Sequence, residues 1–196
     1  MAVVAPTILC ETEADYKATV ERLHPFAKRV HIDLTDGEFA PTFTMVARPS
    51  EYVNQLIALK PYTIIFHTEV QEDLLPILQK VKAAGIHVGV ALLKPTVPAT
   101  VQAYINAADH VLVFSGNLGH YGGTADLMQL EKVRLIQNIR GDLEIGWDGG
   151  AGVDNAFSLA QSGVAVVNAG SSINKAPDPA AAYNQMVAEL NKHSVI

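Results

Sequence analysis

The sequence alternates short apolar runs with longer amphipathic segments, and this alternation is the feature that most restricts the fold. Seven apolar runs have the length of buried strands. They cover residues 3–10, 29–37, 62–70, 87–95, 110–119, 143–150 and 164–170. The segments between and after them carry apolar residues at helical spacing. These segments cover residues 13–27, 50–59, 72–85, 97–108, 126–141, 153–163 and 178–194. Such a regular β-α alternation predicts a parallel sheet.

The alternation fits two architectures, a closed (β/α) barrel and an open doubly wound sheet. Polar residues favour the barrel, because they lie at or just after the ends of the strands, and those ends converge on one rim of a barrel. These residues are His31, Asp33, Asp36, His67, Glu69, Ser115, Asn117, Asp148 and Asn168. No low-complexity stretch or Gly/Ser linker interrupts the chain. We therefore expect an α/β fold of the (β/α) TIM barrel class, with residues 1–196 forming a single domain.

The second predicted strand combines apolar and ionisable residues. Side chains alternate across a strand, so His31 and Asp33 share one face. The other face carries Val30, Ile32 and Leu34. Because burying an unpaired charge is costly, the polar face of a buried strand needs a reason. Three explanations are open: His31 and Asp33 form a buried pair that satisfies itself, the strand is a solvated sheet edge, or the two residues belong to a functional site. The polar residues at the other strand ends favour a functional site.

The polar residues of the rim suggest two kinds of chemistry. Carboxylates with imidazoles suit a divalent ion such as zinc, manganese, iron or cobalt. Asp33 and Asp148 would face each other across the barrel mouth, where such a pair can remove a proton from one face of a carbon and return one to the other. A turn role is the alternative for Asp148, because Asp-Gly-Gly also favours hairpin turns. The helical pattern that follows weakens this alternative.

Glycine-rich segments follow the last three predicted strands, at residues 116–124, 148–152 and 168–173. Backbone N–H groups at helix starts bind anions, and barrels often hold phosphate at the loops after their last two strands. These segments therefore predict a phosphorylated substrate. The alternative is that the glycines only permit tight turns. Neither the dinucleotide-binding nor the P-loop spacing occurs.

Charge and cysteine content restrict the partners and the compartment. With a formal net charge of -6 and no cluster of lysine or arginine, the chain would repel nucleic acid and acidic membranes. The single cysteine, Cys10, excludes an internal disulfide and suits a reducing compartment. Residues 1–15 lack a basic leader and a long apolar run, so we expect no signal peptide or transmembrane helix. We expect a cytoplasmic protein whose partner is a small phosphorylated molecule, with no nucleic-acid or membrane partner.

Seven motifs, in order along the chain, resemble those of the ribulose-phosphate 3-epimerase family of metal-dependent (β/α) barrels. They are APTILC, VHIDLTDGEFAP, FHTE, GVALLKPTVP, VLVFSGNLGHYGGT, WDGG and NAGSSI. The resemblance implies interconversion of D-ribulose 5-phosphate and D-xylulose 5-phosphate by metal-assisted proton transfer at C3. It implies that Asp33 and Asp148 are the acid/base pair and that both, with His31, bind the metal. It also implies contacts with the phosphosugar, from Thr7, Ser115, Gly122, Gly123, Gly149, Gly150, Gly170 and Ser171.

The chain departs from the family pattern between Asp33 and the FHTE motif, which are too close in sequence for a full crossover helix. We therefore expect the second outer helix to be missing, with residues 38–48 forming an irregular link or a short strand. The family's remaining metal ligand is a histidine on the third strand. If that strand is kept, Phe43 occupies the place of this histidine; if it is displaced, His67 supplies the fourth metal contact, which is the outcome we predict.

Three further expectations concern assembly and activity. A missing helix would leave apolar barrel surface uncovered, which predicts a homo-oligomer. One alternative to the epimerase is a non-catalytic relic that still binds a sugar phosphate. The other is an enzyme acting on a different phosphosugar, such as an epimerase of another ketose phosphate.

Overall fold

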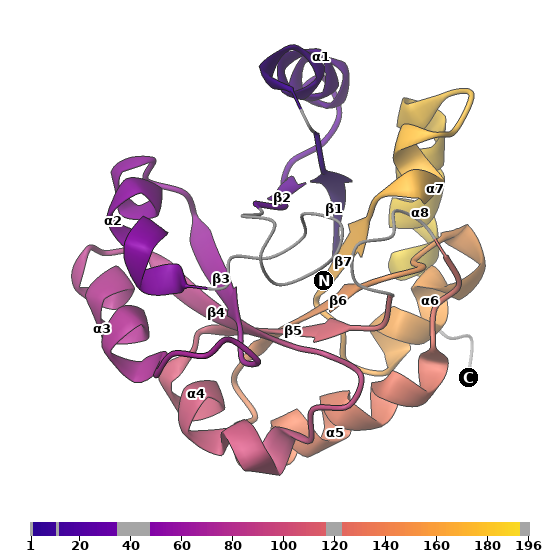
Figure 1. Cartoon of the computed structure of the whole chain (residues 1–196). Coiled ribbons are helices and arrows are strands. Elements are labelled where there is room, and N and C mark those ends of the chain that lie inside the picture. The colour runs from indigo at the N-terminus through magenta and orange to yellow at the C-terminus, as the bar shows by residue number, and fades with distance from the viewer. Residues whose placement is uncertain (1, 11, 35–47, 117–122, 193–196) are drawn as a thin grey trace.

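The computed structural model describes residues 2–10, 12–34, 48–116 and 123–192. Within these ranges seven parallel strands form one sheet, in the order β2-β1-β7-β6-β5-β4-β3. The strands are β1 (Val3–Ile8), β2 (His31–Ile32), β3 (Thr63–His67), β4 (His87–Leu92), β5 (His110–Phe114), β6 (Glu144–Asp148) and β7 (Val166–Ala169). The sheet curls, with most helices around its outside (Figure 1). This order and curl confirm the predicted (β/α) barrel class.

Each of the seven predicted helical segments contains a helix. The helices are α1 (Glu13–Leu23), α2 (Pro49–Ala58), α3 (Leu75–Ala83), α4 (Gln102–Ala107), α5 (Leu130–Ile139), α6 (Val153–Gln161), α7 (Ser171–Asn174) and α8 (Pro179–Leu190). Short 3-10 turns, η1 (Pro98–Val101) and η2 (Leu127–Gln129), precede α4 and α5. The single turn α7 was not predicted. In the part of the chain that the structure describes, no helix is long and apolar enough to cross a membrane.

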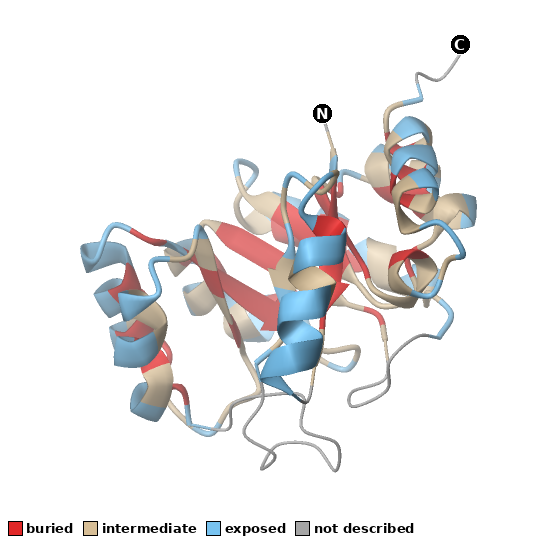
Figure 2. Ribbon diagram, turned by 90° about the horizontal axis from the view of Figure 1, so that it is seen from above, coloured by how far each residue is buried: buried red, intermediate tan, exposed pale blue. Residues whose placement is uncertain are grey.

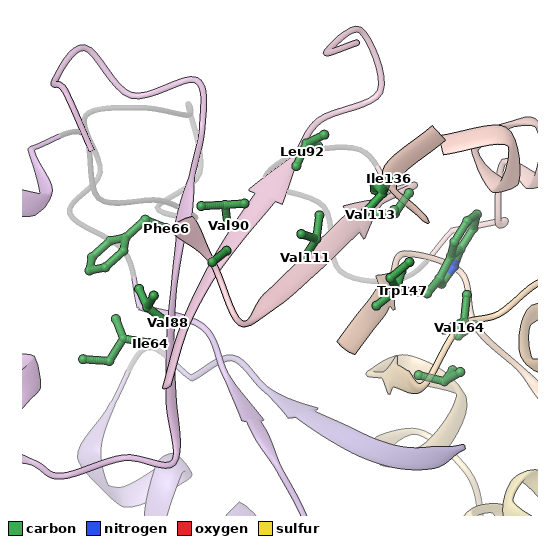
Figure 3. Packing of buried hydrophobic residues seen from close by; sticks show 14 of the residues in the cluster. Ile64, Phe66, Val88, Val90, Leu92, Val111, Val113, Ile136, Trp147 and Val164 are labelled. Carbon is green, nitrogen blue, oxygen red and sulfur yellow. The ribbon is translucent and has the colours of Figure 1, made fainter. Parts of the chain in front are cut away.

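The apolar core lies between the sheet and the outer helices. Val88 and Val90 on β4 lie beside Val111 and Val113 on β5, and all four are fully buried (Figure 3). These are alternate residues of each strand, so the intervening residues face the barrel interior. Burying one such side chain contributes roughly 1.5–3 kcal/mol. The outward faces therefore hold the sheet to its helices, and the inward faces are free to form a site.

Strand β2 is shorter and more exposed than predicted. It consists of two residues, which pair with the end of β1. Val30, Ile32 and Leu34 on its outer face are 39%, 42% and 50% exposed. An apolar run with the length of a buried strand is therefore partly exposed here. The reason is that β2 lies at the edge of the sheet, with one strand partner among the described residues.

Helix α1 is also largely exposed. Leu23 is the buried residue of this helix. Figure 2 shows the helix in front, coloured mostly as exposed, and Figure 1 shows it above β1 and β2. Because β2 is so short, little apolar surface is available beneath α1.

The interval between β2 and β3 is where the chain is predicted to be shortened. These strands stand at the two ends of the strand order, and within the described ranges a single helix, α2, lies between them in sequence. An eight-stranded barrel would place another strand and another helix here. The seven-stranded order thus agrees with a shortened barrel. Of the predicted link at residues 38–48, residues 38–47, including Phe43, lie outside the described residues.

Candidate active site

Three ionisable residues meet at the carboxyl end of the sheet. His31 begins β2, Asp33 directly follows that strand, and Asp148 ends β6. His31 Nε2 lies 3.1 Å from Asp33 Oδ1 and 3.9 Å from Asp148 Oδ2. Since β1 and β7 separate β2 from β6 in the sheet, the contact with Asp148 crosses the barrel interior. One potential ligand atom of each residue lies within 4.8 Å of the other two, and we call these three residues the cluster.

Burial and neighbouring charges shift the pKa values of His31 and Asp148. Burial lowers the pKa of His31, but the hydrogen bond to Asp33 and the negative charges of Asp33 and Asp148 outweigh it, so the pKa is raised overall. Burial, and then the negative charge of Asp33, raise the pKa of Asp148. These causes outweigh the charge of His31 and the hydrogen bond from Asn168 Nδ2, which lies 3.3 Å from Asp148 Oδ2. Asp148 therefore holds a proton more readily than an ordinary aspartate does.

The cluster lines a cavity of about 1200 Å³ to which all seven described strands contribute residues. Thr7, on β1, is 4% exposed and lines this cavity. Its Oγ1 is buried and has no hydrogen-bond partner among the described residues. A buried hydroxyl without a partner is costly, so this oxygen is suited to contact a bound molecule.

Glycine loops after β5, β6 and β7 line the same cavity. The predicted residues found there are Gly123, Gly149, Gly150, Gly170 and Ser171. Gly149 has a φ of +106°, and a Cβ on it would lie 2.1 Å from Gly116 N. Gly150 has a φ of +68°, and a Cβ on it would lie 2.1 Å from Ala125 N. The two loops thus pack backbone against backbone, which requires glycine. Gly122 lies outside the described residues.

Side-chain hydrogen bonds fix the loop after β6. Trp147 Nε1 donates to Gly149 O at 3.1 Å, and Asn155 Nδ2 donates to Gly150 O at 2.9 Å. Ser172 Oγ donates to the carbonyl oxygen of the residue that follows Gly150, at 2.7 Å. A loop held in this way loses little conformational entropy when a ligand binds.

His67 ends β3 and lines the cavity, but it is not one of the three cluster residues. Its Nδ1 lies 3.3 Å from Glu69 Oε2, and its ring meets that of Phe114 edge-on, with centroids 6.1 Å apart. Burial raises the pKa of Glu69, but hydrogen bonds from His67, Thr96 and a backbone N–H outweigh it and lower the pKa to about 2. The structure therefore pairs His67 with Glu69 and does not bring it to the predicted metal ligands.

Among the described residues, Ser115 is the predicted contact residue that does not line the cavity. It is 1% exposed, and its Oγ accepts a hydrogen bond from Asp126 N at 2.7 Å. Strand alternation could have indicated this orientation, because the preceding Phe114 faces the cavity. The reverse holds for Asn168, a strand-end residue with no predicted role, which lines the cavity and binds Asp148.

The chain is similar in sequence to proteins of known activity. The model of the Ribulose-phosphate 3 epimerase family matches residues 42–174. The ribulose-phosphate 3-epimerase, cytoplasmic isoform, of Oryza sativa subsp. japonica is 30% identical, over 97% of this chain and 93% of the rice protein. The ribulose-phosphate 3-epimerase of Helicobacter pylori is 29% identical, over 89% of this chain and 92% of its own length.

The fold is similar to that of solved (β/α) barrels. The crystal structure of 3-hexulose-6-phosphate synthase from Salmonella typhimurium superimposes with a TM-score of 0.62. The alignment covers 90% of this chain and 79% of the synthase, at 23% identity. At this identity the similarity concerns the fold.

Proposed function

Because this chain belongs to the ribulose-phosphate 3-epimerase family, we propose that it interconverts D-ribulose 5-phosphate and D-xylulose 5-phosphate by proton transfer at C3. Membership in this family makes the chain an isomerase, as its sequence predicts. One observation carries the more specific proposal. Two carboxylates from strands that are not neighbours, Asp33 and Asp148, converge beside His31 in one cavity.

Epimerisation needs one group that removes a proton from one face of C3 and another that returns a proton to the opposite face. We assign these roles to Asp33 and Asp148. In one direction, the Asp33 carboxylate takes the C3 proton and leaves an enediolate, and the Asp148 carboxylic acid then donates its proton to the opposite face. Their approach from two strands that are not neighbours in the sheet supports this assignment. In the reverse direction the two residues exchange roles.

The cluster fits a divalent cation. An imidazole and two carboxylates, whose potential ligand atoms lie within 4.8 Å of one another, form a donor set suited to zinc, manganese, iron or cobalt. His31, Asp33 and Asp148 would hold such an ion, and three protein ligands leave further positions open for substrate oxygens. When bound, the ion would supply Lewis-acid stabilisation of negative charge on the substrate.

We assign recognition of the phosphate group to the glycine loops. Gly123, Gly149, Gly150, Gly170 and Ser171 line the cavity, and their backbone N–H groups are the donors that an anion needs. The Thr7 hydroxyl would contact the same substrate. Sulfate or phosphate soaked into crystals is expected at these loops, and an anion bound elsewhere on the rim would contradict the assignment.

The test combines metal analysis of the purified protein with an epimerase assay on Asp33→Asn and Asp148→Asn. We expect each substitution to lower kcat by about 10³-fold or more, because the amide cannot take or give the proton. Asp142→Asn is the matched control, because Asp142 is exposed and pairs with Arg140 outside the cavity. If both cluster variants keep near-normal turnover, the two-base mechanism is wrong. A wild-type protein that binds the sugar phosphate without turnover is instead the non-catalytic relic.

A further inference from the structure

Below the cluster, at the amino ends of the strands, Arg29 and Glu144 form an ion pair across the barrel interior. Arg29 Nη1 donates to Glu144 Oε1 at 2.6 Å and to Glu144 Oε2 at 3.2 Å. The two side chains are 26% and 32% exposed. Arg29 lies two residues before β2, and Glu144 begins β6. The ion pair therefore joins the two strands that carry the cluster.

The positions of the two residues match those of the site aspartates. Arg29 lies four residues before Asp33, and Glu144 lies four residues before Asp148. In an extended segment, residues four apart point to the same face and are separated by about 13 Å. The Arg29–Glu144 ion pair and the contact of 3.9 Å between His31 and Asp148 thus connect the same two strands at two levels.

Few other contacts hold β2 in place. It pairs with β1 through two residue pairs, and no other strand in the described ranges pairs with it. The exposure of Val30, Ile32 and Leu34 shows that little packs against its outer face. A segment with so few buried contacts opens at low free-energy cost, so each remaining contact matters for its position.

Two neighbouring rings lie beside the ion pair. His110 Nδ1 lies 3.4 Å from Glu144 Oε2, and the Arg29 guanidinium carbon lies 5.2 Å from the centroid of the Tyr62 ring. Gly146 gives the imidazole its space, because a Cβ there would lie 2.5 Å from His110 Nε2. The hydrogen bonds from His110 and Arg29 lower the pKa of Glu144 to about 2, and they outweigh burial, which raises it. Glu144 is therefore ionised at neutral pH.

We propose that Arg29 and Glu144 are positioning residues: their ion pair sets the height and separation of β2 relative to β6, and so places Asp33 opposite Asp148. The kinetic consequence rests on the proposed epimerase function. In Arg29→Met the long apolar stem remains but the charge is lost, so β2 is free to shift. The phosphate loops follow β5, β6 and β7, so the shift affects proton transfer more than substrate binding.

Steady-state kinetics of Arg29→Met and Glu144→Gln test the proposal. We expect kcat to fall by about 10- to 100-fold while KM changes by less than about threefold, because a displacement near 1 Å misplaces the catalytic carboxylate. The charge-reversed double variant, Arg29→Glu with Glu144→Arg, is expected to recover part of the lost kcat. Arg140→Met is the matched control: Arg140 pairs with Asp142, is 29% exposed, and does not line the cavity.

Two measurements do not depend on activity. A crystal structure of Arg29→Met is expected to show the distance between His31 Nε2 and Asp148 Oδ2 increased from 3.9 Å while β6 and β7 superimpose on the wild type. Calorimetric titration of the metal-free protein with Co²⁺ is expected to show about tenfold weaker binding in the variant than in the wild type, because His31 and Asp33 move away from Asp148.

The outcomes separate this proposal from the proposed function. If the wild type has no epimerase activity, the proposed function fails. The crystal structures of the Arg29 and Glu144 variants then still test whether the ion pair positions β2 relative to β6. An unchanged cluster geometry in both Arg29→Met and Glu144→Gln overturns the positioning role. A loss of stability with unchanged kcat also overturns it. If Arg29→Met does not fold, Arg29→Lys replaces it, because lysine keeps the charge but lacks the planar guanidinium that lies over the Tyr62 ring.

Discussion

Replacing Glu69 with glutamine is expected to remove stability that depends on charge at the mouth of the barrel. The Glu69 carboxylate accepts hydrogen bonds from Leu93 N at 2.9 Å, from Thr68 Oγ1 at 3.1 Å and from Thr96 Oγ1. It also lies 3.3 Å from His67 Nδ1, and its side chain is 19% exposed. Glutamine keeps the shape and one acceptor oxygen, so the main loss is the negative charge.

The size of the effect follows from the pKa of Glu69. That pKa falls from 4.5 to about 2 in the folded protein. One pKa unit is worth about 1.4 kcal/mol, so the shift corresponds to about 3 kcal/mol of stability at neutral pH. Because the folded state has the lower pKa, the stabilisation is fully present above the pKa of the unfolded chain. It is lost as the pH falls from about 4.5 through about 2.

Urea unfolding, followed by circular dichroism from neutral pH to about pH 2, measures this dependence. We expect Glu69→Gln to unfold with about 2–3 kcal/mol less free energy than the wild type at neutral pH, and the difference to shrink on acidification. Glu51→Gln is the control, because Glu51 is a glutamate of α2 with a side chain 51% exposed, and its ion pair with Arg48 contributes little. A wild-type minus Glu69→Gln difference that stays constant across this pH range would refute the charge argument.

Three further predictions concern the loops, the fourth ligand and the exposed edge. Gly149→Ala is expected to lower stability by about 2 kcal/mol or more, because the new Cβ meets the backbone of Gly116. Gly123→Ala should cost less, since no atom of the described residues lies within 4 Å of a Cβ built there, and equal losses in thermal denaturation would show that the close approach is unimportant. His67→Ala is expected to keep its bound metal in elemental analysis, because His67 lies outside the cluster; loss of the metal would instead support the predicted fourth ligand. Sedimentation velocity is expected to show that the wild type is a homo-oligomer. Ile32→Lys is expected to weaken this association, because Ile32 is 42% exposed on the edge strand. A monomeric wild type would contradict this prediction.

Local sequence pattern was sufficient for much of the fold. Strand and helix periods depend on residues a few positions apart, so the alternation located all seven described strands and the barrel class. It also placed Asp33 and Asp148 at the carboxyl ends of their strands. In a parallel barrel these ends share one rim, which is why position in sequence already indicated a common site.

Contacts across the interior were decided by the tertiary structure. Which strand-end residues touch depends on strand order and on the curl of the sheet, and neither is encoded in a local period. The pairing of His67 with Glu69 and the ion pair between Arg29 and Glu144 belong to this class. The meeting of His31 and Asp148 was indicated by the family resemblance, which implied a shared metal, and by no local period. The exposure of the outer face of β2 also depends on the tertiary structure, because an apolar residue is buried only if another element covers it. The sequence therefore determined which residues reach the rim and the interior, whereas only the packed barrel determined which of them meet.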